Sequence, residues 1–390
     1  MDDLANPYTP GAGEHPAALT GRDAQISQFR LLLGRLERRK AEKRMIISGL
    51  RGVGKTVLLN EFETIAEGEG WSTASREVAS DTDLRFAIAE MSHEILRGLT
   101  RRTMGERLRR ALGVLKAFSV KTPEGYEITV DVDALTGYAD TGDLERDTVE
   151  LFLEIGAAAL EAKTGVLFLF DEMQLLQKRD LEALCAAVHR VGQKRLPVAL
   201  AGAGLPHLPT LLVEAKTYAE RLFAYPELGP LDREAAEAAL VLPAHDEGVE
   251  YEPEALQRIL DYSEGYPYFL QEYGKFAWRV APRSPITLAG VEKACPLVQD
   301  ELDREFFQLR FNKATPAERR YMAAMADLGD GPQSSDQVAK HLGYAGMQGA
   351  SVIRDRLIKK GLVYSPERGL VAFTVPHFAD YMRRKFPFES

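Results

Sequence analysis

A glycine-rich segment places the strongest constraint on the fold of this chain. Residues 49–56 read Gly-Leu-Arg-Gly-Val-Gly-Lys-Thr, which fits G-x-x-x-x-G-K-[ST] at every fixed position. The apolar run 45–48 before it suits a buried strand, and residues 57–66 suit the helix that follows. Glycines let the chain turn tightly, so several backbone N–H groups can point at an anion beside the positive end of that helix. The sequence therefore predicts a phosphate-binding loop between a strand and a helix.

The residues at the end of this loop carry the expected chemistry. Lys55 would reach the β- and γ-phosphate oxygens of a nucleotide, and the Thr56 hydroxyl would take one position on Mg²⁺. The alternative is a glycine-rich turn formed by chance, which the fit of all fixed positions and of both flanks disfavours. The other residues expected to line the nucleotide are Gly49, Gly52, Val53, Gly54 and Val57.

Two acidic residues follow a second apolar run. Residues 166–170 read Val-Leu-Phe-Leu-Phe and lead directly into Asp171 and Glu172. Ligands of open α/β sheets bind at the carboxyl ends of the strands, which would bring both carboxylates to the loop. Asp171 would hold Mg²⁺, directly or through water, and Glu172 would orient and activate an attacking water molecule. An acidic cap for the next helix is the alternative.

The order of apolar runs predicts the organisation of the chain. Strand-like and helix-like stretches alternate as far as Pro230, and strands almost disappear after it. This alternation favours an α/β fold with a parallel sheet covered by helices on both faces. A chain of 390 residues is also too long for one ordinary core. We expect an extended arm at 1–18, a core at 19–230 with an insertion at about 97–146, a small all-α lid at 231–290 and a winged-helix domain at 291–390.

Local patterns give three finer predictions within the core. The apolar run 197–201 suggests a strand that ends in a glycine-containing turn at 202–204, and residues 223–228 suggest a further strand. Residues 119–121 and 126–132 suggest a β-hairpin, because Pro, Glu and Gly separate two β-prone stretches.

Together with the loop, three segments resemble the AAA+/STAND group of ATPases, particularly its archaeal-ATPase-like and origin-recognition-like branches. Residues 19–23 are similar to the adenine-side motif of the group, residues 171–174 to the D-E-x-Q form of its second motif, and residues 263–270 to its G-x-P lid motif. The resemblance implies that Gly21 and Arg22 lie on the adenine side and that Pro267 packs near the nucleotide. It also implies ATP or ADP with Mg²⁺ as ligands, and nucleotide-dependent homo-oligomers.

The sequence departs from the group at two positions. No polar residue follows the run 197–201, where many relatives present one to the γ-phosphate, and Tyr268 stands where origin-recognition-like relatives have an arginine. Both departures suggest slow hydrolysis, or a nucleotide switch. Arg221 is the candidate for an arginine that reaches the nucleotide of a neighbouring subunit. Its alternative role is that of an exposed arginine at a helix end.

The carboxyl-terminal pattern predicts a winged helix over residues 315–386. Three helix-like stretches precede two β-prone stretches, and basic residues lie on the solvent side of the third helix and on the wing. Such residues can contact the phosphates and base edges of duplex DNA. The alternative, implied by the resemblance, is a nucleotide-sensing or protein-docking module. The candidate DNA-binding residues are Ser351, Arg354, Arg356, Lys359 and Arg368.

Composition narrows the class of protein. A net charge of −9 argues against a surface that coats nucleic acid throughout, and 45% hydrophobic with 27% charged residues is typical of a globular protein. With two cysteines and no secretory pattern at residues 1–7, we expect a cytoplasmic protein without a membrane segment. Three functions follow as hypotheses: a DNA-associated ATPase that acts as a nucleotide-dependent switch or assembly factor, a signalling switch that binds an unidentified protein partner without DNA, and a non-hydrolysing scaffold. The intact loop and acidic pair disfavour the third.

Overall fold

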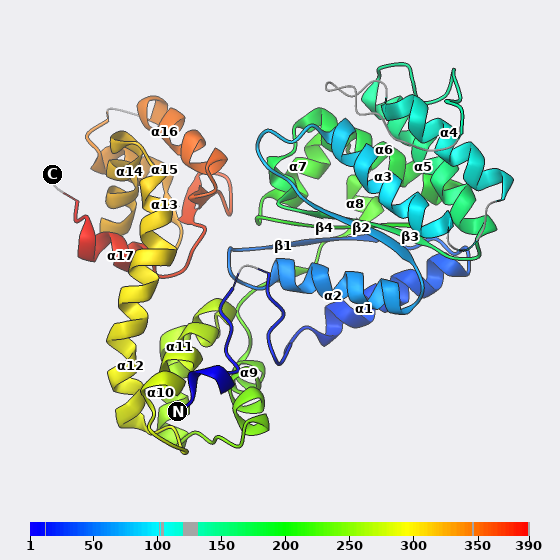
Figure 1. The fold of residues 1–390 in the computed structure, drawn as a ribbon. Helices are drawn as coiled ribbons and strands as arrows, with labels where there is room; N and C mark the ends of the chain where they lie inside the picture. Colours follow the sequence, from blue (N-terminus) through cyan, green and yellow to red (C-terminus); the bar gives the residue numbers. More distant parts are fainter. Residues whose placement is uncertain (12, 101, 103–104, 120–131, 345–346, 389–390) are drawn as a thin grey trace.

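A parallel sheet forms the centre of the amino-terminal half of the chain (Figure 1). The structure is a computed structural model, and it describes residues 1–11, 13–100, 102, 105–119, 132–344 and 347–388. The sheet has the strand order β2-β3-β4-β1-β5, and β6 also pairs with β1. Each of these pairings is parallel. The strands are β1 (Arg44–Gly49), β2 (Ser72–Glu77), β3 (Val166–Asp171), β4 (Val198–Gly204), β5 (Phe223–Ala224) and β6 (Glu227–Leu228).

Helices cover both faces of this sheet, as the alternation of strand and helix predicted. Because both faces are covered, every residue of β1 and β4 is buried. On one face lie α1 (Asp23–Glu37) and α2 (Lys55–Gly68), joined by the stacked rings of Phe29 and Phe62. The other face is covered by α3 (Leu84–Thr100), α4 (Glu106–Ser119), α5 (Leu144–Glu161), α6 (Lys178–Gln193), α7 (Leu208–Ala215) and α8 (Ala219–Leu222). The predicted α/β fold is confirmed.

The predicted turn at 202–204 is wrong, because β4 continues through these residues. Gly202 pairs with Ile46 and Gly204 with Ser48 of β1. The glycines allow close packing rather than a turn: a Cβ at Gly202 would lie 2.1 Å from Met173 Sδ, in the short helix η2 (Met173–Leu175). The single strand predicted at 223–228 is instead two short strands, β5 and β6. Most of the predicted hairpin, residues 120–131, lies outside the described residues.

A column of helices joins a small helical unit to the carboxyl-terminal unit (Figure 1). The helical unit contains α9 (Arg233–Asp246), α10 (Pro253–Ser263) and α11 (Pro267–Val280), and we call it the lid. The column consists of α12 (Leu288–Glu301), the π-helix η3 (Leu302–Phe307) and α13 (Gln308–Asn312). Among the helices of the described residues, none combines the length and the apolar character that a membrane crossing requires.

The carboxyl-terminal unit combines helices with a small antiparallel sheet of order β7-β9-β8. Thr315 caps its first helix in a capping box with Glu318, as the sequence indicated. Three helices and the two strands of the wing lie where the winged-helix prediction put them, whereas the short first strand and the last helix were not predicted. The assignment to the winged-helix class stays a prediction. The elements are α14 (Pro316–Asp327), β7 (Gln333–Ser334), α15 (Ser335–His341), α16 (Met347–Lys359), β8 (Val363–Tyr364), β9 (Leu370–Phe373) and α17 (Phe378–Lys385).

The amino-terminal arm, residues 1–18, lies on the lid (Figure 1). It begins with the short helix η1 (Asp3–Ala5), and its Tyr8 side chain is buried, with the hydroxyl donating to the carbonyl of Leu240 at 2.5 Å. In the opposite direction, the Trp278 indole N–H donates to the carbonyl of Asp2 at 2.8 Å. The arm is therefore packed against α9 and α11.

Candidate functional site

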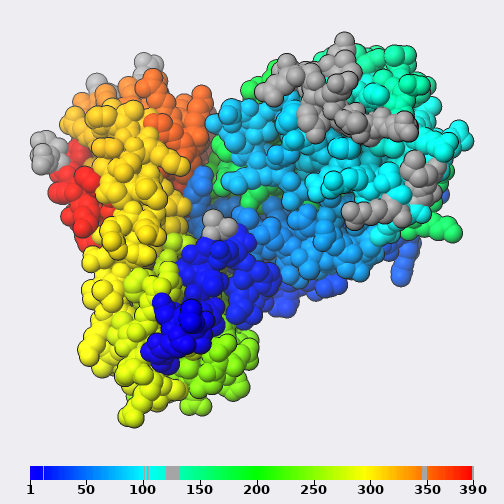
Figure 2. Space-filling model, in the orientation of Figure 1, coloured from blue at the N-terminus to red at the C-terminus, as the bar shows by residue number. Residues whose placement is uncertain are grey.

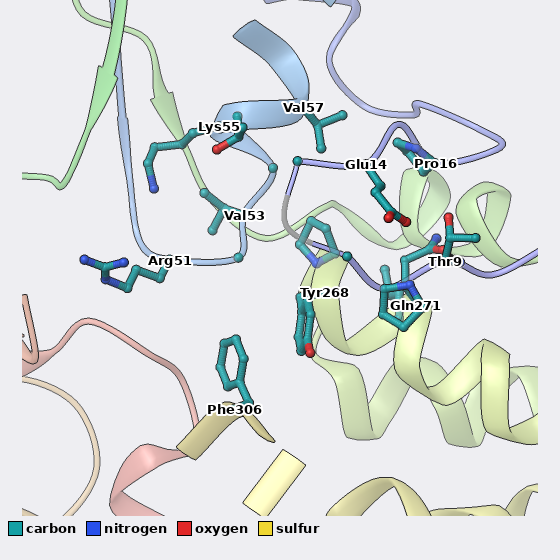
Figure 3. A pocket seen from close by; sticks show the side chains of 18 of the residues that line it. Thr9, Glu14, Pro16, Arg51, Val53, Lys55, Val57, Tyr268, Gln271 and Phe306 are labelled. Atoms are coloured by element: carbon teal, nitrogen blue, oxygen red, sulfur yellow. Dashed lines mark hydrogen bonds between the residues drawn. The ribbon is translucent and has the colours of Figure 1, made fainter. Parts of the chain in front are cut away.

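One cavity of about 600 Å³ lies where the glycine loop, the arm, the lid and the column meet. Figure 2 shows the arm, in dark blue, between the lid and the sheet-containing part of the molecule. In Figure 3, Arg51 and Lys55 lie on one side of the cavity, and Thr9, Glu14 and Gln271 lie on the opposite side. The cavity thus has an end formed by the loop and an end formed by the arm and lid.

The backbone of the glycine loop has the shape predicted for phosphate binding. Gly52 and Gly54 have φ angles of 82° and 91°, which only glycine adopts without strain. Helix α2 begins directly after Gly54, so its positive end points into the cavity. The Lys55 ammonium donates to the carbonyl of Leu50 at 2.8 Å, and burial lowers the pKa of Lys55 against the opposing effect of Glu172 and Asp171. An anion in the loop would offset this loss of hydration.

The two predicted magnesium ligands lie in direct contact. The Thr56 hydroxyl at the start of α2 donates to Asp171 Oδ2 at the end of β3, at 2.5 Å. A hydroxyl and a carboxylate oxygen at this edge of the sheet are ligands that suit Mg²⁺. The structure therefore brings together two residues that stand 115 positions apart in the sequence.

Glu172 is held by two side chains to which the sequence analysis gave no role. Its Oε1 lies 3.4 Å from Nη1 of Arg51, a variable position of the glycine loop. Its Oε2 accepts a hydrogen bond from the Gln174 amide, whose oxygen in turn accepts from the backbone N–H of Leu205 at 3.0 Å. A polar side chain thus stands at the end of β4 after all, and it comes from η2. The D-E-x-Q pattern was the one signal that could have identified Gln174.

One of the two predicted adenine-side residues, Arg22, braces the loop. Arg22 is buried, and its guanidinium donates to the carbonyls of Val53 at 3.0 Å and Gly229 at 2.9 Å. Arg22 lines the cavity, whereas Gly21 and Gly49 are not among the lining residues. A Cβ at Gly49 would lie 2.5 Å from the Leu228 carbonyl oxygen, so this glycine lets β6 approach β1. The predicted residues that line the cavity are Arg22, Gly52, Val53, Gly54, Lys55, Thr56, Val57, Asp171, Glu172 and Pro267.

The lid and the carboxyl-terminal unit both contact the loop. The Tyr266 hydroxyl, one residue before α11, donates to the Arg51 carbonyl. The Arg51 N–H donates to the carbonyl of Thr374 at 3.2 Å, and a Cβ at Gly361 would lie 2.8 Å from Arg51 Nη2. Arg51 therefore links Glu172 to a part of the chain about 200 residues beyond it.

Comparison with known protein families assigns the part of the chain that carries this loop. The AAA ATPase domain family matches residues 18–200. Residues 18–200 are an AAA ATPase domain. The matched segment of this ATPase domain includes the glycine loop, Asp171, Glu172 and Arg22. A second match, to a domain of unknown function (DUF8462), covers residues 304–382 and thus most of the carboxyl-terminal unit. A search of curated proteins found no match.

Solved structures resemble the chain over nearly its whole length. The Walker-type ATPase paby2304 of Pyrococcus abyssi has a TM-score of 0.55 and 15% identity, over 94% of this chain and 96% of that one. The RuvB Holliday junction branch migration motor of Thermotoga maritima has a TM-score of 0.48 and 16% identity, over 96% and 100%. The Orc1 protein of Aeropyrum pernix in complex with DNA has a TM-score of 0.45 and 15% identity, over 95% and 94%. At 15% identity, the likeness to the Pyrococcus abyssi ATPase concerns the fold alone. The TM-scores of the other two structures are below 0.5, so these structures support no inference about this chain.

The structure separates Arg221 from the glycine loop. Arg221 is exposed in α8, directly before β5, and Phe223 of β5 stands level with Arg44, the first residue of β1. The glycine loop follows the last residue of β1. Arg221 therefore lies near the end of the sheet opposite the glycine loop.

The candidate DNA-binding residues lie away from the cavity. Arg354 of α16 is engaged, because its guanidinium lies 3.1 Å from Asp355 and 3.4 Å from the Ser335 hydroxyl. Arg356, Lys359 and Arg368 are exposed. Ser351, also on α16, is partly buried. The structure thus distinguishes the exposed basic residues from the engaged Arg354.

Proposed function

We propose that the chain binds ATP or ADP with Mg²⁺ in this cavity and hydrolyses ATP slowly, as a nucleotide-dependent switch. The contact between Thr56 and Asp171 carries the proposal, because it joins the loop to the acid at the end of β3 at 2.5 Å. Lys55 would bind the β- and γ-phosphates, and the helix end at Gly54 would add its positive charge. Thr56 and Asp171 would hold Mg²⁺, which when bound neutralises charge that develops on the phosphates.

Glu172 would act as the general base of hydrolysis. It would accept a proton from water while the water oxygen bonds to the terminal phosphorus and the bond to the leaving ADP oxygen breaks. In this structure Arg51 and Gln174 both engage its carboxylate. A base held in an ion pair is less available to water, which supports slow basal turnover.

Phosphate release by the wild type, Glu172→Gln and Lys55→Ala tests the proposal. We expect Glu172→Gln to retain ATP binding and lose about 10²-fold or more in rate, the usual contribution of a general base. Lys55→Ala should lose nucleotide binding itself. Equal rates of phosphate release in the wild type and Glu172→Gln would contradict the hydrolysis proposal.

The contacts of the carboxyl-terminal unit favour a nucleotide-sensing role for it. Thr374 and Gly361 contact Arg51, which contacts Glu172, so the position of this unit and the state of the site are physically connected. If a nucleotide binds more tightly when the carboxyl-terminal unit is in one of two positions, its binding would shift the unit toward that position. This supports the hypothesis of a signalling switch.

DNA association is the second proposal for the same unit, and oligomer formation accompanies it. Arg356, Lys359 and Arg368 are exposed and could contact phosphates. Arg221, at the edge of the sheet away from the loop, would reach the nucleotide of a neighbouring copy in a homo-oligomer.

A further inference from the structure

Arg310 is a basic residue of the cavity that belongs neither to the ATPase domain nor to the lid. It lies in α13, in the matched segment of unknown function. Arg310 lines the same cavity as Lys55, Asp171 and Glu172. The column of helices therefore contributes a cation to a site that is otherwise built mostly from the first half of the chain.

Aromatic rings fix the position of this guanidinium. Arg310 Cζ lies 3.9 Å from the centroid of the Phe306 ring, and Nη1 donates to the Phe306 carbonyl. The Phe306 ring stacks on Tyr268 with centroids 4.6 Å apart. A Cβ at Gly52 would lie 3.3 Å from Tyr268 Cβ and 3.8 Å from Phe306 Cζ, so these rings rest on the glycine loop. Arg310 is thus held beside the loop through the rings of Phe306 and Tyr268, which Figure 3 labels.

The charge on Arg310 has no carboxylate partner within 4.0 Å among the described residues. Burial, together with the neighbouring guanidinium of Arg51, lowers the pKa of Arg310 to about 10, which leaves it a cation at neutral pH. A partly desolvated cation beside another cation is costly unless an anion compensates it. The arrangement is therefore that of an anion site.

The neighbours of Arg310 indicate which part of a nucleotide it faces. Its electrostatic neighbours include Arg51, which lies on the loop side of the cavity in Figure 3, and Glu172, whose carboxylate lies 3.4 Å from Arg51. Glu172 is the residue beside which the attacking water and the terminal phosphate would lie. The arm, at the other end, would surround the base and sugar.

We propose that Arg310 binds the terminal phosphate of a nucleoside triphosphate, and that the carboxyl-terminal segment thereby distinguishes ATP from ADP. The inference rests on the proposed function, because it requires a nucleotide in the cavity. A guanidinium suits this role, since its planar fork can donate two hydrogen bonds to one phosphate.

The test compares Arg310→Gln with the wild type in binding a non-hydrolysable ATP analogue and ADP, each with Mg²⁺. We expect affinity for the triphosphate to fall about 10- to 100-fold, as for a charge-assisted hydrogen bond, and affinity for ADP to change by less than about threefold. Arg310→Lys should lie between the two, because it keeps the charge without the fork. Arg304→Gln is the matched control: Arg304 belongs to η3 in the same column, and its side chain is exposed and pairs with Glu301 at 2.8 Å.

Equal losses for both nucleotides in Arg310→Gln and Arg310→Lys would assign Arg310 a structural role and overturn the inference. Unchanged affinity for the triphosphate would also overturn it. Lys55→Ala separates this failure from that of the proposed function. If the wild type binds nucleotide through Lys55 while Arg310→Gln behaves as wild type, only the inference fails. If the wild type binds neither nucleotide, both fail.

Discussion

Single residues hold the acidic end of the site in place from several directions. Glu172 has a φ of 53°, in the left-handed region that disfavours a side chain. Gln174 and Arg51 each fix one oxygen of its carboxylate. The glycines of β4 make room for η2, which carries Gln174. The geometry of the general base therefore depends in part on Gln174 and Gly202, neither of which lines the cavity.

The substitution Gly202→Ala tests this dependence. A Cβ would lie 2.1 Å from Met173 Sδ and 3.0 Å from Ile46 Cδ1, so the buried Met173 side chain, or η2 with it, must shift. We expect the free energy of unfolding to fall by about 1–3 kcal/mol, the usual effect of overpacking, and phosphate release to fall with it. Urea denaturation and a phosphate-release assay measure the two effects.

Gly34→Ala is the control for that experiment. A Cβ at Gly34, in α1, meets no atom within 4 Å, so alanine should be neutral or stabilising by about 0.5–1 kcal/mol. If Gly202→Ala unfolds at the same urea concentration as Gly34→Ala, the close packing of η2 on β4 does not contribute to the stability of the fold.

Among the elements, helix α5 is anchored at its amino-terminal end by a buried carboxylate. Asp147 is fully buried and accepts hydrogen bonds from the Thr141 hydroxyl at 2.6 Å, the Gly142 N–H at 3.0 Å and Arg85 at 2.7 Å. Arg85 comes from α3, so this one carboxylate ties two helices to the loop before α5. Breaking a buried pair leaves a charge without compensation, which is strongly destabilising.

Asp147→Asn should therefore lower the free energy of unfolding at pH 7 by about 2–4 kcal/mol. Burial raises the pKa of Asp147, but hydrogen bonds from Thr141 and Arg85 outweigh it and the net pKa is lowered. A carboxyl with a lowered folded pKa stabilises the fold above its unfolded pKa, and the contribution is lost as the pH falls through the folded pKa. Unfolding in urea from neutral pH to below about pH 4 should show this loss in the wild type and a flatter profile in Asp147→Asn.

The exposed Asp81 supplies the control, since Asp81→Asn should alter neither stability nor its pH profile. If the free energy of unfolding of Asp147→Asn falls with pH as steeply as that of the wild type, carboxyl groups other than Asp147 dominate the acid sensitivity.

Elements defined by local patterns could be predicted from the sequence, whereas contacts between distant segments could not. The apolar runs before the glycine loop and before Asp171 identified β1 and β3, because strands buried on both faces carry few polar residues. The same reasoning failed at 202–204, since glycine signals a turn and a close approach equally well. Arg51 stands at a variable position of the loop motif, which gives it no predicted role. Arg310 lies outside any motif, and only the packing of the column against the loop brings it into the site.

At the scale of the whole molecule, DNA association can be tested through two exposed arginines of the carboxyl-terminal unit, Arg356 on α16 and Arg368 between β8 and β9. Arg356→Ala with Arg368→Ala should weaken binding to duplex DNA, and removing two phosphate contacts should reduce the slope of log affinity against log salt by about two. Arg354→Ala should have a smaller effect, because Asp355 and Ser335 already engage that side chain. Titrations at several salt concentrations measure both quantities. Unchanged affinity in the double variant would leave the nucleotide-sensing role as the function of this unit.

The position of the arm has a kinetic consequence. Its first eight residues are fastened to the lid through Tyr8 and Asp2, yet the residues that follow wall the cavity beside the ATPase domain. In that wall the Gly13 carbonyl accepts from the Asn60 amide at 2.9 Å, so the arm is fastened to the lid at one end and to α2 at the other. Separation of the lid from the ATPase domain would have to break contacts at one end of the arm, and this requirement would slow the release of a bound nucleotide.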